Sequence, residues 1–284
     1  MTEKDTVSPE SPFTLSGTTA IVTGGGRGIG RAIVHQLVSA GANVLVCDLD
    51  QQALQETQAS ARNSECVAPI CGDLMEPTFP EQIVNAALKA LGLIDIVVNC
   101  AGFSWGGVIQ KTTDEQFLAM LNIHVVAPFR LLRAASQYLR ETAKQEIAGG
   151  QRVMRKVVNI TSITGTGGNP GQAGYAAGKA GVIGLTKTLA KEWGRYNINV
   201  NAVGFGLIQT RMTQPLKPEA KINMGGKDIP IGVQPAMLDS IAAACPLGRI
   251  GTPEEAAGAV LFFCSPLSDY VTGEVLICSG GYHF

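Results

Sequence analysis

Charged residues are scarce in this chain: only 16% of its 284 residues are Asp, Glu, Lys or Arg, and the formal net charge is −1. It has no block of basic residues, which argues against nucleic acid as the main partner. No apolar run approaches the roughly 20 residues that a membrane-spanning helix needs. The first twelve residues are polar, contain two prolines and lack the apolar core of a signal peptide, so residues 1–15 are expected to form a loose tail.

Histidine is also scarce, and the cysteines are not paired. The chain has three histidines and no Cys-x-x-C motif, so a metal site is not expected. The cysteines are odd in number and several lie in apolar runs, as small buried hydrophobic residues do in a reducing compartment. A cytoplasmic location is therefore expected. The seven cysteines are Cys47, Cys66, Cys71, Cys100, Cys245, Cys264 and Cys278.

One stretch, residues 161–179, holds the polar groups best suited to catalysis. Ser162 follows an apolar run that ends at Ile160 and predicts a buried strand. Tyr175 and Lys179 are four residues apart, so they share one face of a helix. The Gly-rich loop between strand and helix lets the three polar groups converge at the end of a strand, where open α/β sheets bind ligands.

The chemistry of these groups suits proton transfer. A free tyrosine has a pKa of about 10, and a nearby ammonium group favours its phenolate form. Tyr175 could then exchange a proton with a substrate oxygen while Ser162 hydrogen-bonds the same oxygen. The alternative is a surface helix with an ordinary Tyr/Lys pair. Ser162, thirteen residues before Tyr175, and a glycine-rich motif near the N-terminus favour the catalytic interpretation.

A glycine-rich turn follows the apolar run Thr19–Thr23 and precedes a helical pattern. A strand, a glycine-rich turn and a helix in this order form the usual context of a dinucleotide-binding motif, although the spacing G-x-x-x-G-x-G differs from G-x-G-x-x-G. The alternative is a flexible turn without a ligand. In the dinucleotide interpretation, backbone amides of the turn approach a pyrophosphate at the helix N-terminus. The expected cofactor contacts in this turn are Gly24, Arg27, Gly28, Ile29 and Gly30.

Asp48 bears on the choice of cofactor. It follows the second apolar run, Asn43–Cys47, eighteen residues after Gly30, where a ribose 2′-hydroxyl is expected. A carboxylate accepts a hydrogen bond from that hydroxyl and repels a 2′-phosphate, so NAD is favoured over NADP. Arg27 could contact either cofactor, and Asp48 could instead be a turn or helix-cap residue.

Two further turns are expected beside the cofactor. Asp73 and Leu74 follow a third strand-like run, where Asp73 either meets the adenine ring or serves as a turn aspartate. Asn99 ends the fourth run and leads into Ala101 and Gly102, whose tight turn would pass close to the cofactor.

The chain as a whole alternates strand and helix patterns. This predicts a single-domain α/β Rossmann fold over residues 16–284, with a doubly wound parallel sheet of about seven strands and helices on both faces. A helical pattern from Asp114 to Leu139 contains Pro128, which should bend it. Residues 141–156 are polar and predict an exposed connection, and the irregular stretch 204–246 predicts a substrate-binding loop or lid.

Taken in order, these motifs resemble the short-chain dehydrogenase/reductase family from Thr18 to Tyr282. The resemblance is strongest to its 3-oxoacyl carrier-protein reductases and its 3-hydroxyacyl and alcohol dehydrogenases. It implies Tyr175 as the acid/base, Ser162 as the donor that orients the oxygen, and Lys179 as the group that lowers the pKa of Tyr175 and holds the nicotinamide ribose. It also implies a homotetramer. The matching segments are TGGGRGIG at 23–30, Asp48, Asp73, NCAG at 99–102, Ser162, YAAGK at 175–179 and NAV at 201–203.

Three positions depart from the family pattern. His124 stands where a catalytic asparagine is usual, Cys100 replaces the asparagine of the NAG turn, and Phe205 replaces a proline. Ile208 and Thr210 still match the positions that flank the carboxamide.

Two roles for His124 are open. Its imidazole could titrate in the proton relay, since the unperturbed pKa lies near 6.5. Alternatively, Pro128 displaces the carbonyl of residue 124, and that carbonyl holds a relay water whatever the side chain is.

The leading interpretation is an NAD-dependent oxidoreductase acting on a secondary alcohol or ketone. The alternatives are a catalytically silent NAD(P)-binding sensor, an NADP-dependent 3-oxoacyl reductase and a sugar-nucleotide epimerase or dehydratase, which usually needs an added C-terminal domain. An apolar substrate such as a 3-hydroxyacyl thioester, a steroid or a cyclic alcohol is expected. The apolar residues of the 204–246 stretch are Phe205, Leu207, Met212, Leu216, Met224, Ile229, Ile231, Met237 and Leu238.

Overall fold

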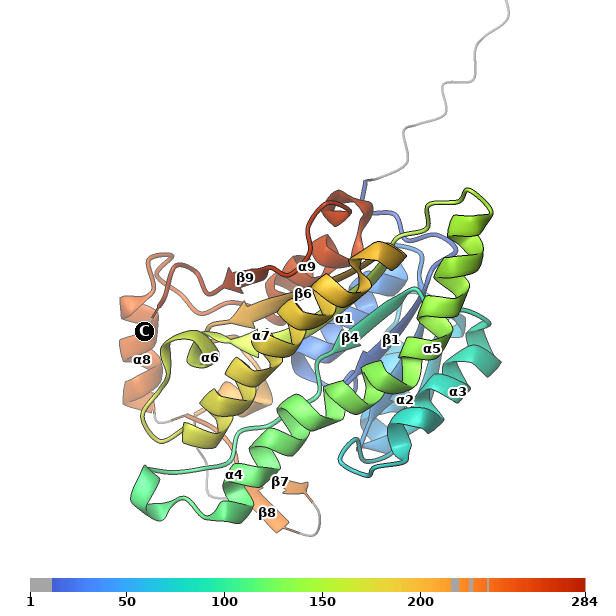
Figure 1. Ribbon diagram of the computed structural model, residues 1–284. Coiled ribbons are helices and arrows are strands. Elements are labelled where there is room, and N and C mark those ends of the chain that lie inside the picture. The colour runs from blue at the N-terminus through green and yellow to red at the C-terminus, as the bar shows by residue number, and fades with distance from the viewer. Residues whose placement is uncertain (1–11, 216–219, 225–226, 234, 284) are drawn as a thin grey trace, which may run out of the picture.

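A seven-stranded parallel sheet forms the centre of the computed structural model, which describes residues 12–283 except 216–219, 225–226 and 234 (Figure 1). The strand order is β3-β2-β1-β4-β5-β6-β9. This confirms the predicted doubly wound sheet. The strands are β1 (Thr19–Thr23), β2 (Asn43–Asp48), β3 (Val67–Cys71), β4 (Ile96–Asn99), β5 (Arg155–Ser162), β6 (Ile198–Phe205) and β9 (Val275–Cys278).

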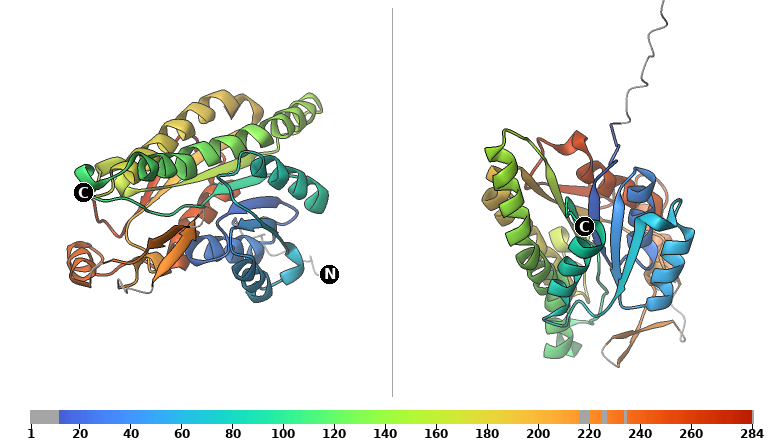
Figure 2. Two further views of the ribbon diagram at one scale, coloured as in Figure 1. Left: turned by 90° about the horizontal axis from the view of Figure 1, so that it is seen from below. Right: turned by 90° about the vertical axis from the view of Figure 1, so that its right-hand side faces the viewer.

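Helices cover both faces of the sheet, which gives the three layers seen in Figure 2. One face carries α1 (Gly28–Ser39), α2 (Gln51–Ser60) and α9 (Pro253–Cys264). The opposite face carries α3 (Phe79–Leu91), α4 (Asp114–Leu121), α5 (Ala127–Ala148) and α7 (Ala173–Trp193). A short helix, α6 (Ile163–Gly167), directly follows β5.

Successive strand residues pack alternately into the two cores. In β1, Ala20 and Val22 join the core beneath α1 and α9, while Ile21 joins the core beneath α3 and α5. In β2, Leu45 joins the core beneath α3 and α5, and Val46 joins the core beneath α1 and α9. Because both faces are covered, the strands are apolar throughout, as is usual for parallel sheets.

The helical pattern predicted from Asp114 is interrupted before Pro128. Between α4 and α5 lies a π-helical turn, Asn122–Val126, in which the Ala127 amide donates to the Asn122 carbonyl. Pro128 has no amide hydrogen and cannot make the normal bond to the carbonyl four residues back, so a wider turn is a natural solution here.

The complete run Asp114–Ala148 is long and apolar enough, by length and composition alone, to resemble a membrane span. Its buried side chains, from Met120 to Ala143, belong to the hydrophobic core that covers one face of the sheet. Other apolar side chains of the same run, Phe117, Leu118, Phe129 and Ile147, are exposed.

The predicted exposed connection over residues 141–156 was wrong in extent. Helix α5 continues to Ala148, and β5 already begins at Arg155. Arg155 and Lys156 are both buried and each forms an ion pair with a carboxylate. A buried, paired cation cannot be distinguished from an exposed one by sequence polarity.

The stretch 204–246, predicted to be irregular, contains ordered elements. Strands β7 (Lys221–Met224) and β8 (Lys227–Pro230) form an antiparallel hairpin, and α8 (Pro235–Ala244) follows. These elements stand at the end of the sheet where the strands β5 and β6 finish (Figure 1). Leu216, one of the apolar residues expected to meet substrate, lies outside the described residues.

The expected N-terminal tail lies mostly outside the described residues, which begin at Pro12. Leu15 is buried in the core beneath α1, and its amide donates to the Ala40 carbonyl. The chain is therefore part of the fold before residue 16.

The sheet topology places the site. The connection after β1 runs through α1 on one face, and the connection after β4 runs through α4 and α5 on the other. Strands β1 and β4 are parallel neighbours whose connections leave on opposite faces, so a crevice opens between their carboxyl ends.

Candidate active site

The turn between β1 and α1 is packed too tightly for side chains at two glycines. A Cβ on Gly24, whose φ is +68°, would lie 2.6 Å from the Cα of Ala101, and a Cβ on Gly30 would lie 2.0 Å from the Gly24 carbonyl oxygen. No side chain that the structure describes caps the N-terminus of α1, where Arg27 has an extended backbone. The first amides of α1 are therefore available to an anion such as a pyrophosphate.

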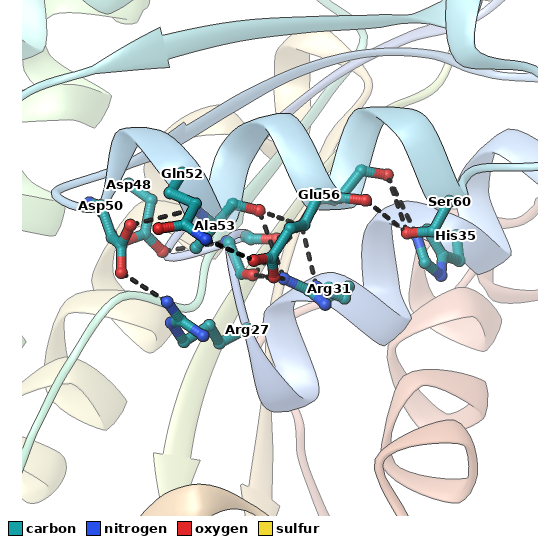
Figure 3. Close-up of polar contacts among 12 residues, drawn as sticks. Arg27, Arg31, His35, Asp48, Asp50, Gln52, Ala53, Glu56 and Ser60 are labelled. Carbon is teal, nitrogen blue, oxygen red and sulfur yellow. Dashed lines mark hydrogen bonds and ion pairs between the residues drawn. The ribbon is translucent and has the colours of Figure 1, made fainter.

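Asp48 is fixed at the edge of this turn (Figure 3). Its two carboxylate oxygens accept from the amides of Gly26, at 2.9 Å, and Asp50, at 3.1 Å. Arg27 forms an ion pair of 2.6 Å with Asp50. The hydrogen bond between these two side chains raises the pKa of Arg27 and lowers that of Asp50.

The turn after β4 is tied to β1 by hydrogen bonds from its backbone to a side chain. The amides of Cys100 and Ala101 both donate to the Thr23 hydroxyl, at 3.0 and 3.1 Å. The side chain of Asn99 donates to Asn159 at 2.8 Å and is therefore used inside the sheet. This turn lies directly against the glycine-rich turn, as expected for one that borders the cofactor.

Asp73 and Leu74 lie in the turn after β3. A carboxylate oxygen of Asp73 accepts from the Met75 amide at 2.8 Å, as in a turn aspartate, and its contact with the adenine ring stays a prediction. Leu74 is buried in the core on the α3 side.

The structure brings Ser162, Tyr175 and Lys179 together at the carboxyl end of β5. The Ser162 hydroxyl accepts from the Thr164 amide at 3.2 Å and donates to the Phe205 carbonyl at 3.4 Å. Tyr175 and Lys179 come from the first turns of α7, and the ammonium nitrogen lies 5.7 Å from the centre of the tyrosine ring.

Burial is the main cause of the pKa shifts of Lys179 and Tyr175. It lowers the pKa of Lys179 to about 8 and raises the pKa of Tyr175, while a hydrogen bond from Ser162 opposes the shift on Tyr175. Removing the phenolate from water therefore outweighs the effect of its neighbours on the pKa of Tyr175, and the lowering by Lys179 that the resemblance implies stays a prediction. At neutral pH Tyr175 is a phenol that can donate a proton.

His124 lies in the π-helical turn, only 2% exposed, and its ring meets the Tyr175 ring edge-on at 5.0 Å. Its Nε2 lies 2.8 Å from the Phe103 carbonyl oxygen. A carbonyl can only accept, so Nε2 carries the hydrogen and Nδ1 is an acceptor. Nδ1 receives no hydrogen bond from any residue that the structure describes.

The surroundings of His124 keep it neutral. Burial, followed by the charge of Lys179, lowers its pKa well below 6.5. Gly102 makes room for the ring, because a Cβ there would lie 2.4 Å from Cε1. A neutral imidazole with a free acceptor nitrogen can receive a hydrogen bond from water but is not a source of protons at neutral pH.

The segment after β6 reaches back to the glycine-rich turn. Ile208 is buried and pairs with Gly251 through an isolated bridge. The Thr210 methyl group lies 3.3 Å from the position of a Cβ on Gly28. The crevice is therefore bounded by this segment as well as by the turns after β1 and β4. The tight turn, the open helix N-terminus and the carboxylate of Asp48 together fit a dinucleotide.

Sequence reasoning missed a polar link across the crevice. Gln172 donates to the Ser104 hydroxyl at 3.2 Å and accepts from Asn169 at 2.9 Å and from Thr164 at 3.3 Å. It joins the loops after β4 and β5 just before Tyr175. It also missed the role of Asp50, whose only signal was its place two residues beyond Asp48.

Comparison with known proteins agrees with this geometry. A family profile described as enoyl-(acyl carrier protein) reductase matches residues 24–283. A 3alpha-hydroxysteroid dehydrogenase of Mediterraneibacter gnavus is 34% identical over 94% of this chain and 97% of its own length. A (3R)-3-hydroxyacyl-CoA dehydrogenase of Canis lupus familiaris is 34% identical over 96% and 99%. A 3-oxoacyl-(acyl-carrier-protein) reductase of Thermotoga maritima is 32% identical over 94% and 98%.

Proposed function

The chain belongs to the short-chain dehydrogenase/reductase family, whose members act on hydroxyl and keto groups, and on this premise we propose that it interconverts a secondary alcohol and a ketone with NAD. One observation carries the proposal. Ser162, Tyr175 and Lys179 converge at the end of β5, beside a glycine-rich turn that fits a dinucleotide.

The residues of the chain manage the substrate oxygen and its proton. Ser162 lies close enough to Tyr175 to lower the pKa of the phenol, so one substrate oxygen can meet both hydroxyl groups. As a phenol, Tyr175 donates its proton to a ketone oxygen in reduction; in oxidation its phenolate form accepts the proton of the alcohol. The Lys179 ammonium, held by the Ile160 carbonyl at 2.8 Å, favours the phenolate. The nicotinamide supplies or accepts the hydride when it is bound.

Asp48 supports NAD as the cofactor, because its carboxylate stands at the end of β2 where a 2′-phosphate would meet negative charge. The alternative is an NADP-dependent 3-oxoacyl reductase, suggested by the name of the Thermotoga maritima relative. In that case Arg27 would have to leave Asp50 to meet the phosphate.

An apolar substrate of the hydroxyacyl, oxoacyl, steroid or cyclic alcohol class is proposed. The names of the relatives specify hydroxysteroid, hydroxyacyl and oxoacyl groups, and the segment after β6 supplies apolar residues such as Ile229 and Ile231. Large apolar side chains exposed on the helices, on β9 and in the turn between α9 and β9 support a homotetramer. They include Phe129, Ile147, Leu267, Tyr270 and Leu276. Seven free cysteines support a cytoplasmic location.

The test is NADH and NADPH oxidation, followed by absorbance, with 3-oxoacyl thioesters, steroid ketones and cyclic ketones. We expect turnover with at least one ketone and a much higher kcat/KM for NADH than for NADPH. Tyr175→Phe should lower turnover by about 10²–10⁴-fold, the usual contribution of general acid–base catalysis, while NADH binding persists. Retained turnover in Tyr175→Phe would show that the proton comes from elsewhere.

Two other outcomes would contradict the proposal. Comparable kcat/KM for NADH and NADPH would show that Asp48 does not select NAD over NADP. Binding of NADH without turnover on any ketone or alcohol would favour a catalytically silent sensor of the same fold.

A further inference from the structure

We propose that Asp50 is a second determinant of cofactor choice: by holding Arg27 in an ion pair, it withholds the arginine of the glycine-rich turn from a 2′-phosphate. The inference rests on the proposed binding of a dinucleotide. It assigns to Asp50 a role that acts through Arg27 and complements the direct repulsion from Asp48.

The position of Asp50 is fixed by three contacts (Figure 3). One carboxylate oxygen lies 2.6 Å from a terminal guanidinium nitrogen of Arg27. The other caps α2 by accepting from the Ala53 amide at 3.0 Å. The Asp50 amide donates to Asp48 at 3.1 Å. The two carboxylates are therefore held side by side at the end of β2, and Arg27 is drawn to the outer one.

Arg31, the next arginine along the chain, is held by several hydrogen bonds and an ion pair. Arg31 donates to the Gly26 carbonyl from two nitrogens, at 2.9 and 2.6 Å, and to the Thr57 hydroxyl at 3.0 Å. It also forms an ion pair with Glu56 at 3.0 Å. Arg27 has fewer contacts and is 41% exposed, so it is the arginine that a phosphate can recruit.

The balance of charges at this site favours a ribose without a 2′-phosphate. Asp48 and Asp50 carry two negative charges against the single positive charge of Arg27. A 2′-phosphate would have to displace Asp50 from Arg27 and leave that carboxylate next to the phosphate. Removing the charge of Asp50 frees Arg27 and removes one repulsion in a single step.

The experiment measures dissociation constants of NADH and NADPH from cofactor fluorescence for the wild type and Asp50→Asn. Asparagine caps helices as well as aspartate does, so the start of α2 should be preserved. We expect NADPH to bind about tenfold more tightly to Asp50→Asn, as a new charge-assisted hydrogen bond allows, with NADH affinity changed less than about twofold. The gain should shrink at high salt because the site is partly exposed.

Two further variants isolate the mechanism. Glu56→Gln removes a carboxylate from the same helix. Glu56 pairs with Arg31 and acts on Arg27 only through its charge, so this variant should change the NADPH/NADH ratio much less than Asp50→Asn does. Arg27→Gln combined with Asp50→Asn should lose the gain in NADPH affinity. Circular dichroism of each variant checks that the fold is retained.

Three results would overturn the inference: an unchanged NADPH affinity in Asp50→Asn with intact NADH binding, an equal gain in Glu56→Gln, or a gain that survives the loss of Arg27. Failure of the proposed function is measured separately, as wild-type protein that binds neither dinucleotide or that binds NADH without turnover on any ketone or alcohol.

Discussion

Replacing Lys179 by methionine should stabilise the protein while removing its activity. Lys179 is 5% exposed, and burial lowers its pKa from 10.5 to about 8. That difference corresponds to roughly 3 kcal/mol by which the fold disfavours the charged ammonium. Methionine has a similar length and no charge, so it avoids this cost.

One contact offsets part of the gain. The Lys179 ammonium donates to the Ile160 carbonyl, and its removal leaves that carbonyl without this donor. A lost hydrogen bond of this kind costs about 1 kcal/mol. At pH 7 the methionine variant should therefore be more stable than the wild type by about 2 kcal/mol.

The difference in stability between the methionine variant and the wild type should decrease as the pH rises. Below pH 8 the lysine is protonated in the folded and unfolded chains, so its cost is fully present. Between about 8 and 10.5 the folded chain loses this proton first, and the stability of the wild type rises relative to the variant. The advantage of the variant should shrink through this window.

Urea unfolding of the cofactor-free protein at pH 7, 8, 9 and 10 measures this difference. Lys187→Met is the matched control, because Lys187 is exposed on the same helix and its loss should change stability by less than about 0.5 kcal/mol. A Lys179→Met variant less stable than the wild type at pH 7, or an advantage that does not decline with pH, would refute the reasoning.

Two other predictions concern His124 and the segment after β6. His124→Asn should retain activity with little change in the pH–rate profile, because the imidazole is already neutral at pH 7. A large loss of kcat, or the loss of one limb of the pH–rate profile near neutral pH, would show that the ring is catalytic. If residues 204–246 close over the substrate, cofactor plus ketone should slow proteolysis within them, whereas equal cleavage rates with and without ligands would contradict closure.

Local signals in the sequence were sufficient for the sheet and for the central residues of the site. The short apolar run before Ser162 predicted a buried strand, which is β5 in the structure, and the spacing of Tyr175 and Lys179 places both on one helix face. The glycines at 24–30 lie between a strand and a helix, which is where the structure has them. Each of these features depends on residues that are close in sequence.

Features that depend on distant contacts were not predictable in this way. The pairing of Arg27 with Asp50 requires the start of α1 and the end of β2 to meet. The raised pKa of Tyr175 follows from burial by several elements, whereas the sequence showed only its neighbour Lys179. Polar residues near 155 suggested exposure because nothing local reveals that their charges are paired inside the fold.

The departures from the family pattern are tolerable because the main chain holds the site. Lys179, Ser162 and His124 each donate to a backbone carbonyl, those of Ile160, Phe205 and Phe103. A carbonyl is present whatever side chain its residue carries, so phenylalanine in place of proline at 205 still provides the acceptor for Ser162. The orientation of the polar groups is therefore set by the ends of β5 and β6 and by the loop after β4. A substitution should disturb it only where it moves that backbone, as a side chain at Gly102 would by pressing on His124.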